Sequence, residues 1–264
     1  MEIGIITGSG TYALPELVGS AEQVRTEWGT TDVTRGELAG VRVAHVSRHG
    51  EGHVRLSNHV EHRANIAALA ELGVDAVIAV TVCGAVDAGV PLGSLICFDD
   101  LHFLSNRLPD GSLCTFYEQA GDPRRGHWIY ESPYSRELRR ALLAAAAGSG
   151  VEIRDGGCYG HVDGPRFNSK AEIRGLAAAG VTAVSQTAGP ETVLAGEAEL
   201  PFALVGYATD YANGVRAEPT PVERLLELIA ASTGSFARLL SEAVGAIDPA
   251  ALAPAGVVYR FHDE

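Results

Sequence analysis

The stretch 201-PFALVGYATDYANG-214 decides the fold class of this chain. Its apolar part, residues 201–208, has the length and composition of a buried β-strand. Ligands of open α/β sheets bind where such strands end, and Asp210 follows this apolar run closely. Partial burial would raise the pKa of its carboxyl group, so that the group could hold or deliver a proton. A turn or helix-capping aspartate is the alternative interpretation.

Short apolar runs alternate with helical patterns along the chain, which predicts one three-layer α/β domain. The expected strands are Ile3–Ile6, Val41–Val46, Ala76–Val82, Leu95–Leu101, Ile153–Tyr159, Ala183–Ser185 and Ala203–Tyr207. Helices are expected over Ser57–Leu72, after the capping box Ser169–Glu172, from Pro190 to about Leu200, and from Pro221 onward. The last helix carries one apolar stripe, formed by Val222, Leu225, Leu226, Ile229, Phe236, Leu239 and Leu240. The long irregular stretch Ser105–Arg125 is typical of a cover over a site or a subunit contact.

The composition limits the class of function. The chain has 264 residues, a formal net charge of -13 and 46% hydrophobic residues. No basic face is evident, which argues against nucleic acid and anionic membrane surfaces as partners. The beginning Met1–Ile6 is typical of a strand rather than a signal peptide, and no apolar run is long enough for a membrane span. The four cysteines lack CxxC spacing, so we expect reduced thiols and a cytoplasmic protein.

Three segments at predicted strand ends could together bind an oxyanion. Thr7–Thr11 follows the first strand, and its glycines can present backbone N–H groups beside the Ser9 hydroxyl. Arg48 follows the second strand and offers a fork of donors that matches phosphate. Thr187 stands just before a predicted helix N-terminus. The alternatives are a plain turn, a surface arginine and a capping residue.

Other chemistries fit the sequence less well. Gly8, Gly10 and Ala13 satisfy the relaxed dinucleotide fingerprint, but neither a crossover helix nor an acid about 20 residues later is evident. Residues 45–62 contain several histidines without an H-E-x-x-H pattern or a cysteine or aspartate cluster, so no metal is expected. A serine hydrolase of the common α/β type would need G-x-S-x-G, which Gly8-Ser9-Gly10 lacks.

Taken in chain order, these motifs resemble the purine nucleoside phosphorylase superfamily, and most closely its 5′-methylthioadenosine phosphorylase branch. The resemblance covers about residues 3–245. The matching pieces are Gly8-Ser9-Gly10, Arg48-His49-Gly50 with His53, Arg63-Ala64-Asn65, Thr81–Gly84, Thr115-Phe116-Tyr117, His127, Gly164-Pro165-Arg166-Phe167, Ala171-Glu172, Thr187, Pro190-Glu191 and Thr209-Asp210-Tyr211. The resemblance implies one domain over residues 1–264, with its core at about 3–245 and a C-terminal tail at 246–264. It also implies a mixed, twisted central sheet flanked by helices.

The resemblance further implies phosphorolysis of an N-glycosidic bond in a purine nucleoside, with or without a 5′ modification. Inorganic phosphate is then a co-substrate, and no cofactor is expected. The implied catalytic residue is Asp210, which delivers a proton or hydrogen bond to the leaving base. The implied phosphate ligands are Ser9, Arg48, His49, Val82 and Thr187, the base contacts are Phe167, Asp210, Asn213 and Ser185, and the ribose and 5′ contacts are Gln186, His127 and His53. His127 would act in a neighbouring subunit of a homotrimer or a dimer of trimers.

The sequence departs from the family pattern near the base and the sugar. The family branch commonly has Asp-x-Asp in the base loop, whereas this chain has Ala212 at the second position, followed by Asn213. Gln186 stands where that branch has a methionine, and Glu61-His62 replaces an Asn-Tyr pair. We therefore expect phosphorolysis of a non-standard nucleoside, and a 6-oxopurine remains open beside an aminopurine. A nucleoside hydrolase and a non-catalytic nucleoside-binding protein are the alternatives.

Overall fold

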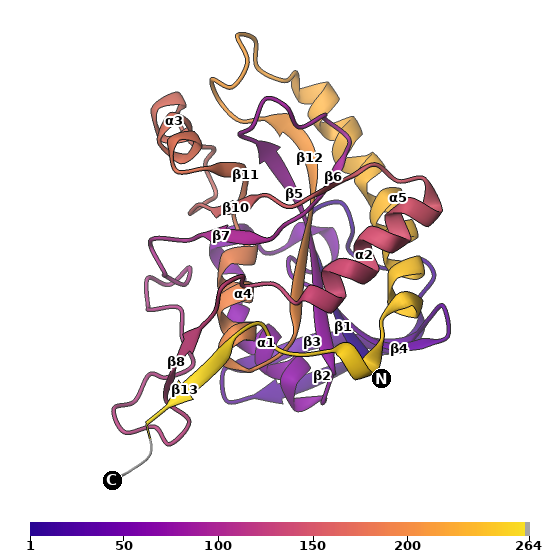
Figure 1. The fold of residues 1–264 in the computed structure, drawn as a ribbon, viewed down its shortest axis with the longest axis vertical. Helices are drawn as coiled ribbons and strands as arrows, with labels where there is room; N and C mark the ends of the chain where they lie inside the picture. The colour runs from indigo at the N-terminus through magenta and orange to yellow at the C-terminus, as the bar shows by residue number, and fades with distance from the viewer. Residues whose placement is uncertain (262–264) are drawn as a thin grey trace.

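Four parallel strands form the centre of the sheet (Figure 1). They are β1 (Glu2–Thr7), β4 (Val41–Ser47), β5 (Ala76–Ala85) and β12 (Phe202–Tyr211), with β1 between β4 and β5, and β12 on β5. The computed structural model describes residues 1–261. Because all four strands run in one direction, their carboxyl ends meet at one edge of the sheet.

Antiparallel strands extend this centre, so the sheet is mixed as predicted. Next to β4 lies the hairpin of β2 (Val18–Thr26) and β3 (Gly29–Leu38). The last residues of β5 pair with β11 (Val181–Ser185), which continues to β10 (Cys158–His161) and β7 (Asp100–His102). β12 pairs with β6 (Leu95–Cys97), and β6 pairs with β9 (Ile153–Asp155). The sheet therefore divides at β5.

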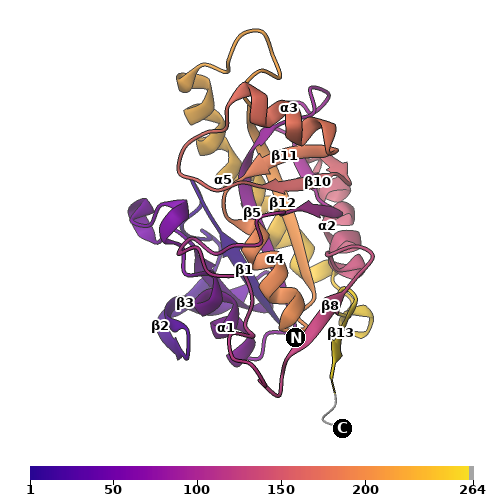
Figure 2. The ribbon, with the colours of Figure 1, turned by 90° about the vertical axis from the view of Figure 1, so that its left-hand side faces the viewer.

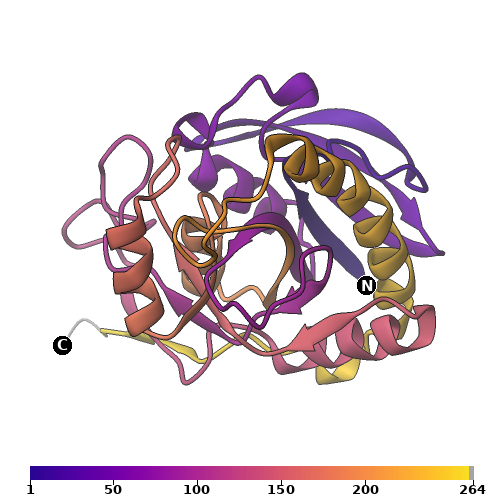
Figure 3. The ribbon, with the colours of Figure 1, turned by 90° about the horizontal axis from the view of Figure 1, so that it is seen from above.

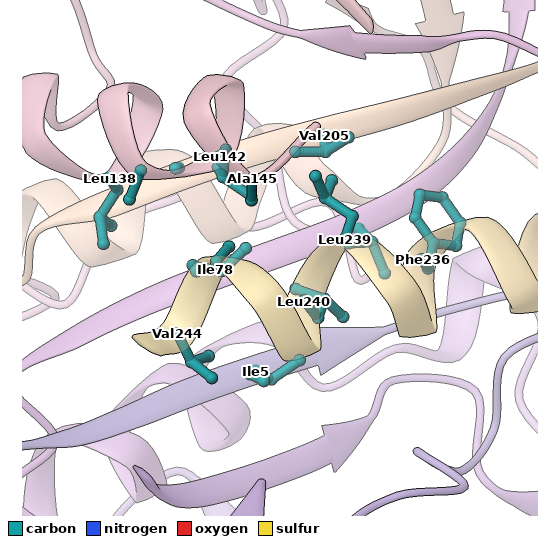
Figure 4. Close-up of a cluster of buried hydrophobic side chains, with 14 of the residues drawn as sticks. Ile5, Ile78, Leu138, Leu142, Ala145, Val205, Phe236, Leu239, Leu240 and Val244 are labelled. Carbon is teal, nitrogen blue, oxygen red and sulfur yellow. The ribbon is translucent and has the colours of Figure 1, made fainter. Parts of the chain in front are cut away.

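Two helices cover each face of the sheet, which gives three layers when the molecule is seen from above (Figure 3). On one face, α2 (Arg136–Ser149) packs against α5 (Val222–Ala246). Their side chains meet Ile5, Ile78 and Val205 of the central strands (Figure 4). In α5 the buried residues Phe236, Leu239, Leu240, Ala243 and Val244 follow the spacing of one helix face.

The opposite face carries α1 (His62–Glu71) and α4 (Ala188–Glu197), and α1 also packs against β2 and β3 (Figure 2). Ile66 and Leu69 of α1 and Leu194 of α4 belong to the second core cluster. α3 (Lys170–Ala178) lies near the end of the sheet where the carboxyl ends meet (Figure 1). It begins with the predicted capping box, in which Ser169 and Glu172 each accept a backbone N–H of the other. The short 3-10 helices are Glu51–His53, Ser57–His59 and Pro249–Ala251.

The structure corrects several predicted boundaries. The runs Leu95–Leu101 and Ile153–Tyr159 each divide into two short strands that belong to different parts of the sheet. The helix expected over Ser57–Leu72 begins only at His62, and the β2–β3 hairpin and α2 were not predicted. The described part of the predicted tail contains β13 (Val257–Arg260), which pairs with β8 (Gly126–Ile129) (Figure 1). Residues 262–264 of that tail lie outside the described residues.

Candidate active site

A cavity of about 270 Å³ opens where the carboxyl ends of the central strands meet. It collects all the predicted site residues except Arg48 and His127. Those that line it are Ser9, His49, His53, Val82, Phe167, Ser185, Gln186, Thr187, Asp210 and Asn213. The topology explains this meeting, since β1, β4, β5 and β12 are parallel neighbours and β11 ends beside β5.

Asp210 lies near the end of β12, directly after an irregularity in the strand pairing between Ala208 and Asp210. Such bulges re-aim a side chain, and here the carboxylate faces Gly84 of β5, where an added Cβ would lie 3.2 Å from Oδ2. Burial raises the pKa of Asp210, while a hydrogen bond from the Thr209 hydroxyl to Oδ1 (2.9 Å) counteracts part of this rise. Asp210 is thus a strand residue whose raised pKa favours the protonated carboxyl group. It is neither a turn residue nor a helix cap.

Thr187 and His49 also line the cavity, and the Thr187 hydroxyl is a hydrogen-bond donor suited to an anion. Thr187 is the N-cap residue of α4, yet its side chain makes no capping hydrogen bond, which leaves the buried hydroxyl available to a ligand. Burial and the nearby Arg48 charge lower the pKa of His49 to about 3. Its neutral ring places Nδ1 2.8 Å from the carbonyl of Arg55, so Nδ1 donates there, Nε2 carries a lone pair, and the ring itself offers no N–H to an anion. The His49 ring stacks on the His53 ring at 4.2 Å.

Arg48 does not line this cavity, and its guanidinium lies against Gly8. Its side chain is fully enclosed, and Nε and Nη2 each donate to one carboxylate oxygen of Glu191 at 2.7 Å. Nη1 donates to the Val80 carbonyl, also at 2.7 Å, and would collide with any Cβ at Gly8. The arginine predicted as a direct phosphate ligand is therefore half of a buried ion pair, directly behind the glycine loop that carries Ser9.

Comparisons with known proteins agree with this geometry. A family model described as "Phosphorylase superfamily" matches residues 2–245. The chain belongs to the phosphorylase superfamily.

Individual relatives support the same family. A probable 6-oxopurine nucleoside phosphorylase of Thermococcus kodakarensis is 35% identical over 248 residues, covering 92% of this chain and 91% of the relative. An S-methyl-5′-thioadenosine phosphorylase of Thermofilum pendens is 33% identical, covering 94% and 92%. The solved methylthioadenosine phosphorylase of Schistosoma mansoni, in complex with adenine, superposes with a TM-score of 0.82 at 27% identity, covering 94% and 92%. The predicted family, fold class and enzyme class are confirmed.

His127 of this phosphorylase lies far from its own cavity. It belongs to β8, opposite Tyr259 of β13, and its ring contacts Phe261 at 5.5 Å between centroids. The β8–β13 ribbon projects from the end of the molecule that lies opposite the carboxyl ends of β5 and β12 (Figure 1), whereas the cavity is lined by residues at those ends. A role for His127 in nucleoside binding therefore requires a second copy of the chain.

A second cavity, of about 320 Å³, adjoins the first and shares Ser57 and Gln186 with it. Two buried histidines on its wall were not predicted as site residues. Within residues 1–261, both ring nitrogens of His62 and Nδ1 of His161 lack a hydrogen-bond partner. Nδ1 of His62 lies 3.9 Å from Glu191, so this residue adjoins the Arg48 ion pair. The replacement of a family tyrosine at His62 was the available sequence signal, whereas His161 had none.

Further lining residues were missed because their patterns indicated core. Leu225 and Ile229 of α5 line the first cavity, and Val222 and Leu226 are exposed, although the sequence placed all four on one apolar stripe together with core residues. Thr81 also lines the cavity, and its hydroxyl lies 3.1 Å from that of Ser185. Within residues 1–261, no group of three or more His, Cys, Asp or Glu side chains could hold a metal ion, and no helix is long and apolar enough to cross a membrane.

Acid should destabilise this protein through its buried histidines. Burial lowers the pKa of His45 to about 4 and those of His49 and His161 to about 3, below the usual value of about 6.5 in an unfolded chain. Since the unfolded state binds the proton more readily, the stabilisation is complete above about pH 6.5 and is lost as pH falls towards the folded-state values. We expect the free energy of unfolding to fall by up to about 1.4 kcal/mol per pH unit for each such histidine.

Urea unfolding at intervals between pH 7.5 and 5 measures this slope. The variant His161→Gln should show a shallower slope, whereas His59→Gln, at an exposed position, should match the wild type. A free energy of unfolding that does not change over this range would contradict the prediction.

Proposed function

We propose that this phosphorylase cleaves a 6-oxopurine nucleoside with inorganic phosphate, giving the free base and ribose 1-phosphate. The family of this chain and the arrangement of the cavity both support phosphate-dependent cleavage of a purine nucleoside. The preference for a 6-oxo base is carried by one observation, which is that the base loop after Asp210 provides no second carboxylate. Ala212 stands where the family branch commonly has the second aspartate, and it is a buried residue that lines the cavity. One of the relatives described above is also named for 6-oxopurine nucleosides.

The base is placed between Phe167 and Asp210. Phe167 is 62% exposed at the cavity mouth, so its ring is free to stack on a planar base. Asp210, with its raised pKa, supplies the proton or hydrogen bond that neutralises the leaving base. Asn213 donates one amide N–H to the Asn168 carbonyl at 2.7 Å, which leaves its other N–H and its carbonyl oxygen for a ligand.

This set of groups favours an oxo base on chemical grounds. A 6-amino group needs an acceptor, and a second carboxylate would supply one, but Ala212 supplies none. A 6-oxopurine presents an acceptor at O6 and a donor at N1, and an amide can both donate and accept. The missing acid therefore penalises adenine more than hypoxanthine.

Phosphate is placed against Ser9, Thr187 and the backbone N–H groups of His49 and Val82. From there it attacks the sugar on the face opposite the base and stabilises the positive charge that develops as the glycosidic bond breaks. Arg48 supports this position from behind Gly8, and Glu191 fixes its guanidinium. Two of the five N–H bonds of the guanidinium remain beyond those given to Glu191 and Val80.

The active assembly is proposed to be a homotrimer, or a dimer of trimers, in the cytoplasm. In such an assembly, the β8–β13 ribbon would carry His127 to the sugar end of a neighbouring cavity. Ile129, Val257 and Tyr259 of the ribbon expose large apolar side chains, as expected of a surface that another subunit covers. The four cysteines are free thiols, which fits a reducing compartment.

A substrate comparison tests the proposed base preference. We expect the purified protein to cleave inosine and 5′-methylthioinosine in phosphate, with kcat/KM for adenosine lower by on the order of tenfold or more, because a substrate group without a partner is rejected. The matched variant is Ala212→Asp, which restores a second carboxylate and should shift the preference towards adenosine. If wild type prefers adenosine, the base assignment is wrong.

A further inference from the structure

Gln186 occupies the junction between the two ends of the nucleoside cavity. It directly follows Ser185, the last residue of β11 on the base side, and precedes Thr187, the N-cap residue of α4 on the phosphate side. All three residues line the cavity. In the binding mode proposed above, the sugar connects the base to the carbon that phosphate attacks. The sugar must therefore lie against Gln186.

Two hydrogen bonds hold the Gln186 amide in one orientation. The Ser57 hydroxyl donates to Oε1 at 2.9 Å, and Nε2 donates to the Arg166 carbonyl at 3.2 Å. Gly164 packs so closely that any Cβ there would collide with both Oε1 of Gln186 and Oγ of Ser57. The amide is therefore positioned by polar partners in the narrow wall between the two cavities.

The remaining hydrogen-bonding capacity of this amide matches a sugar diol. A glutamine amide has two N–H donors and two acceptor lone pairs, and one of each is already used. One N–H and one lone pair remain, so the amide can donate to one hydroxyl and accept from its neighbour. The 2′- and 3′-hydroxyls of ribose form such a vicinal pair. A 2′-deoxyribose lacks one of these hydroxyls, so either the free N–H or the free lone pair of the amide stays without a partner, at a cost in free energy.

We propose that Gln186 is a specificity residue that recognises the ribose diol and makes this phosphorylase select ribonucleosides over 2′-deoxyribonucleosides. Ser57 is the positioning residue that orients its amide. The inference rests on the nucleoside position described under Proposed function.

Sugar discrimination in purified variants tests the inference. The measurement is the ratio of kcat/KM for inosine to that for 2′-deoxyinosine, which does not depend on the fraction of folded enzyme. We expect a wild-type ratio on the order of ten- to a hundredfold, which corresponds to the cost of leaving one hydrogen-bonding group without a partner. The variant Gln186→Met keeps a long side chain without polar N or O atoms and should bring the ratio close to one. Ser57→Ala should lower the ratio by a smaller factor.

A matched control is Phe167→Leu, which alters the base contact and should slow both substrates equally, with the ratio unchanged. A wild-type ratio near one would overturn the inference, as would a Gln186→Met variant that keeps the wild-type ratio. Failure of the proposed function has a different signature, because wild type would then cleave neither inosine nor 2′-deoxyinosine in a phosphate-dependent way. That result would remove both proposals.

Discussion

The variant Asp210→Ala is expected to lower kcat for nucleoside phosphorolysis by about 10²–10⁴, the range of general acid catalysis. Asp210 is mostly buried, and desolvation raises its pKa, so its carboxyl group can hold a proton for the leaving base. The KM for phosphate should remain close to wild type, because the proposed phosphate position is at Ser9 and Thr187. Steady-state kinetics with phosphate and nucleoside varied independently separates these two effects.

A milder variant sharpens the assignment. Asp210→Asn keeps the shape of the side chain and can donate an N–H hydrogen bond, but it does not transfer a proton. Its kcat should therefore fall between those of wild type and Asp210→Ala. If either variant mainly weakens phosphate saturation and leaves kcat intact, Asp210 does not act on the base.

The second large effect is expected on stability, from Arg48→Ala. This change leaves the Glu191 carboxylate with no arginine partner at a position that is 0% exposed. Breaking one side of a buried ion pair costs about 3–5 kcal/mol, because an uncompensated charge stays in the protein interior. Urea unfolding at pH 7.5 should show this loss, and phosphate saturation should weaken as well.

A double variant separates the structural role of Arg48 from its role towards phosphate. Replacing both partners with apolar residues, Arg48→Met with Glu191→Leu, removes both buried charges and should recover most of the lost stability. The free energy of phosphate binding should nevertheless remain less favourable than in wild type by about 1.5–3 kcal/mol, the value of a charge-assisted hydrogen bond. A stable double variant with wild-type phosphate saturation would show that Arg48 serves the fold alone.

The sequence predicted the central strands and the cavity because both depend on one pattern, an apolar run that ends in polar or glycine residues. Residues 201–214 and the segments around Ser9 and Thr187 all have this form, and parallel strands bring such ends together. The β2–β3 hairpin was not predicted because β2 is largely exposed, and its sequence, VGSAEQVRT, does not alternate between apolar and polar residues. The runs at 95–101 and 153–159 were predicted as continuous because only two residues connect the two strands in each run, Phe98-Asp99 and Gly156-Gly157.

The sequence did not predict which side chains contact each other across long sequence distances. Arg48 and Glu191 are 143 positions apart, and a lone arginine at a strand end has the same sequence pattern whether it faces a ligand or a buried carboxylate. The direction of Leu225 and Ile229 was equally hidden, since a helix that lines a cavity and a helix that packs on a core have similar periodicity. The position of His127 relative to a nucleoside depends on a second chain and remains a prediction.

The most direct test of the account follows inosine cleavage by the wild-type protein with and without inorganic phosphate, and identifies the sugar product. We predict that cleavage requires phosphate and yields hypoxanthine together with ribose 1-phosphate. Cleavage at the same rate without phosphate, with free ribose as the product, would contradict the account and identify a hydrolase.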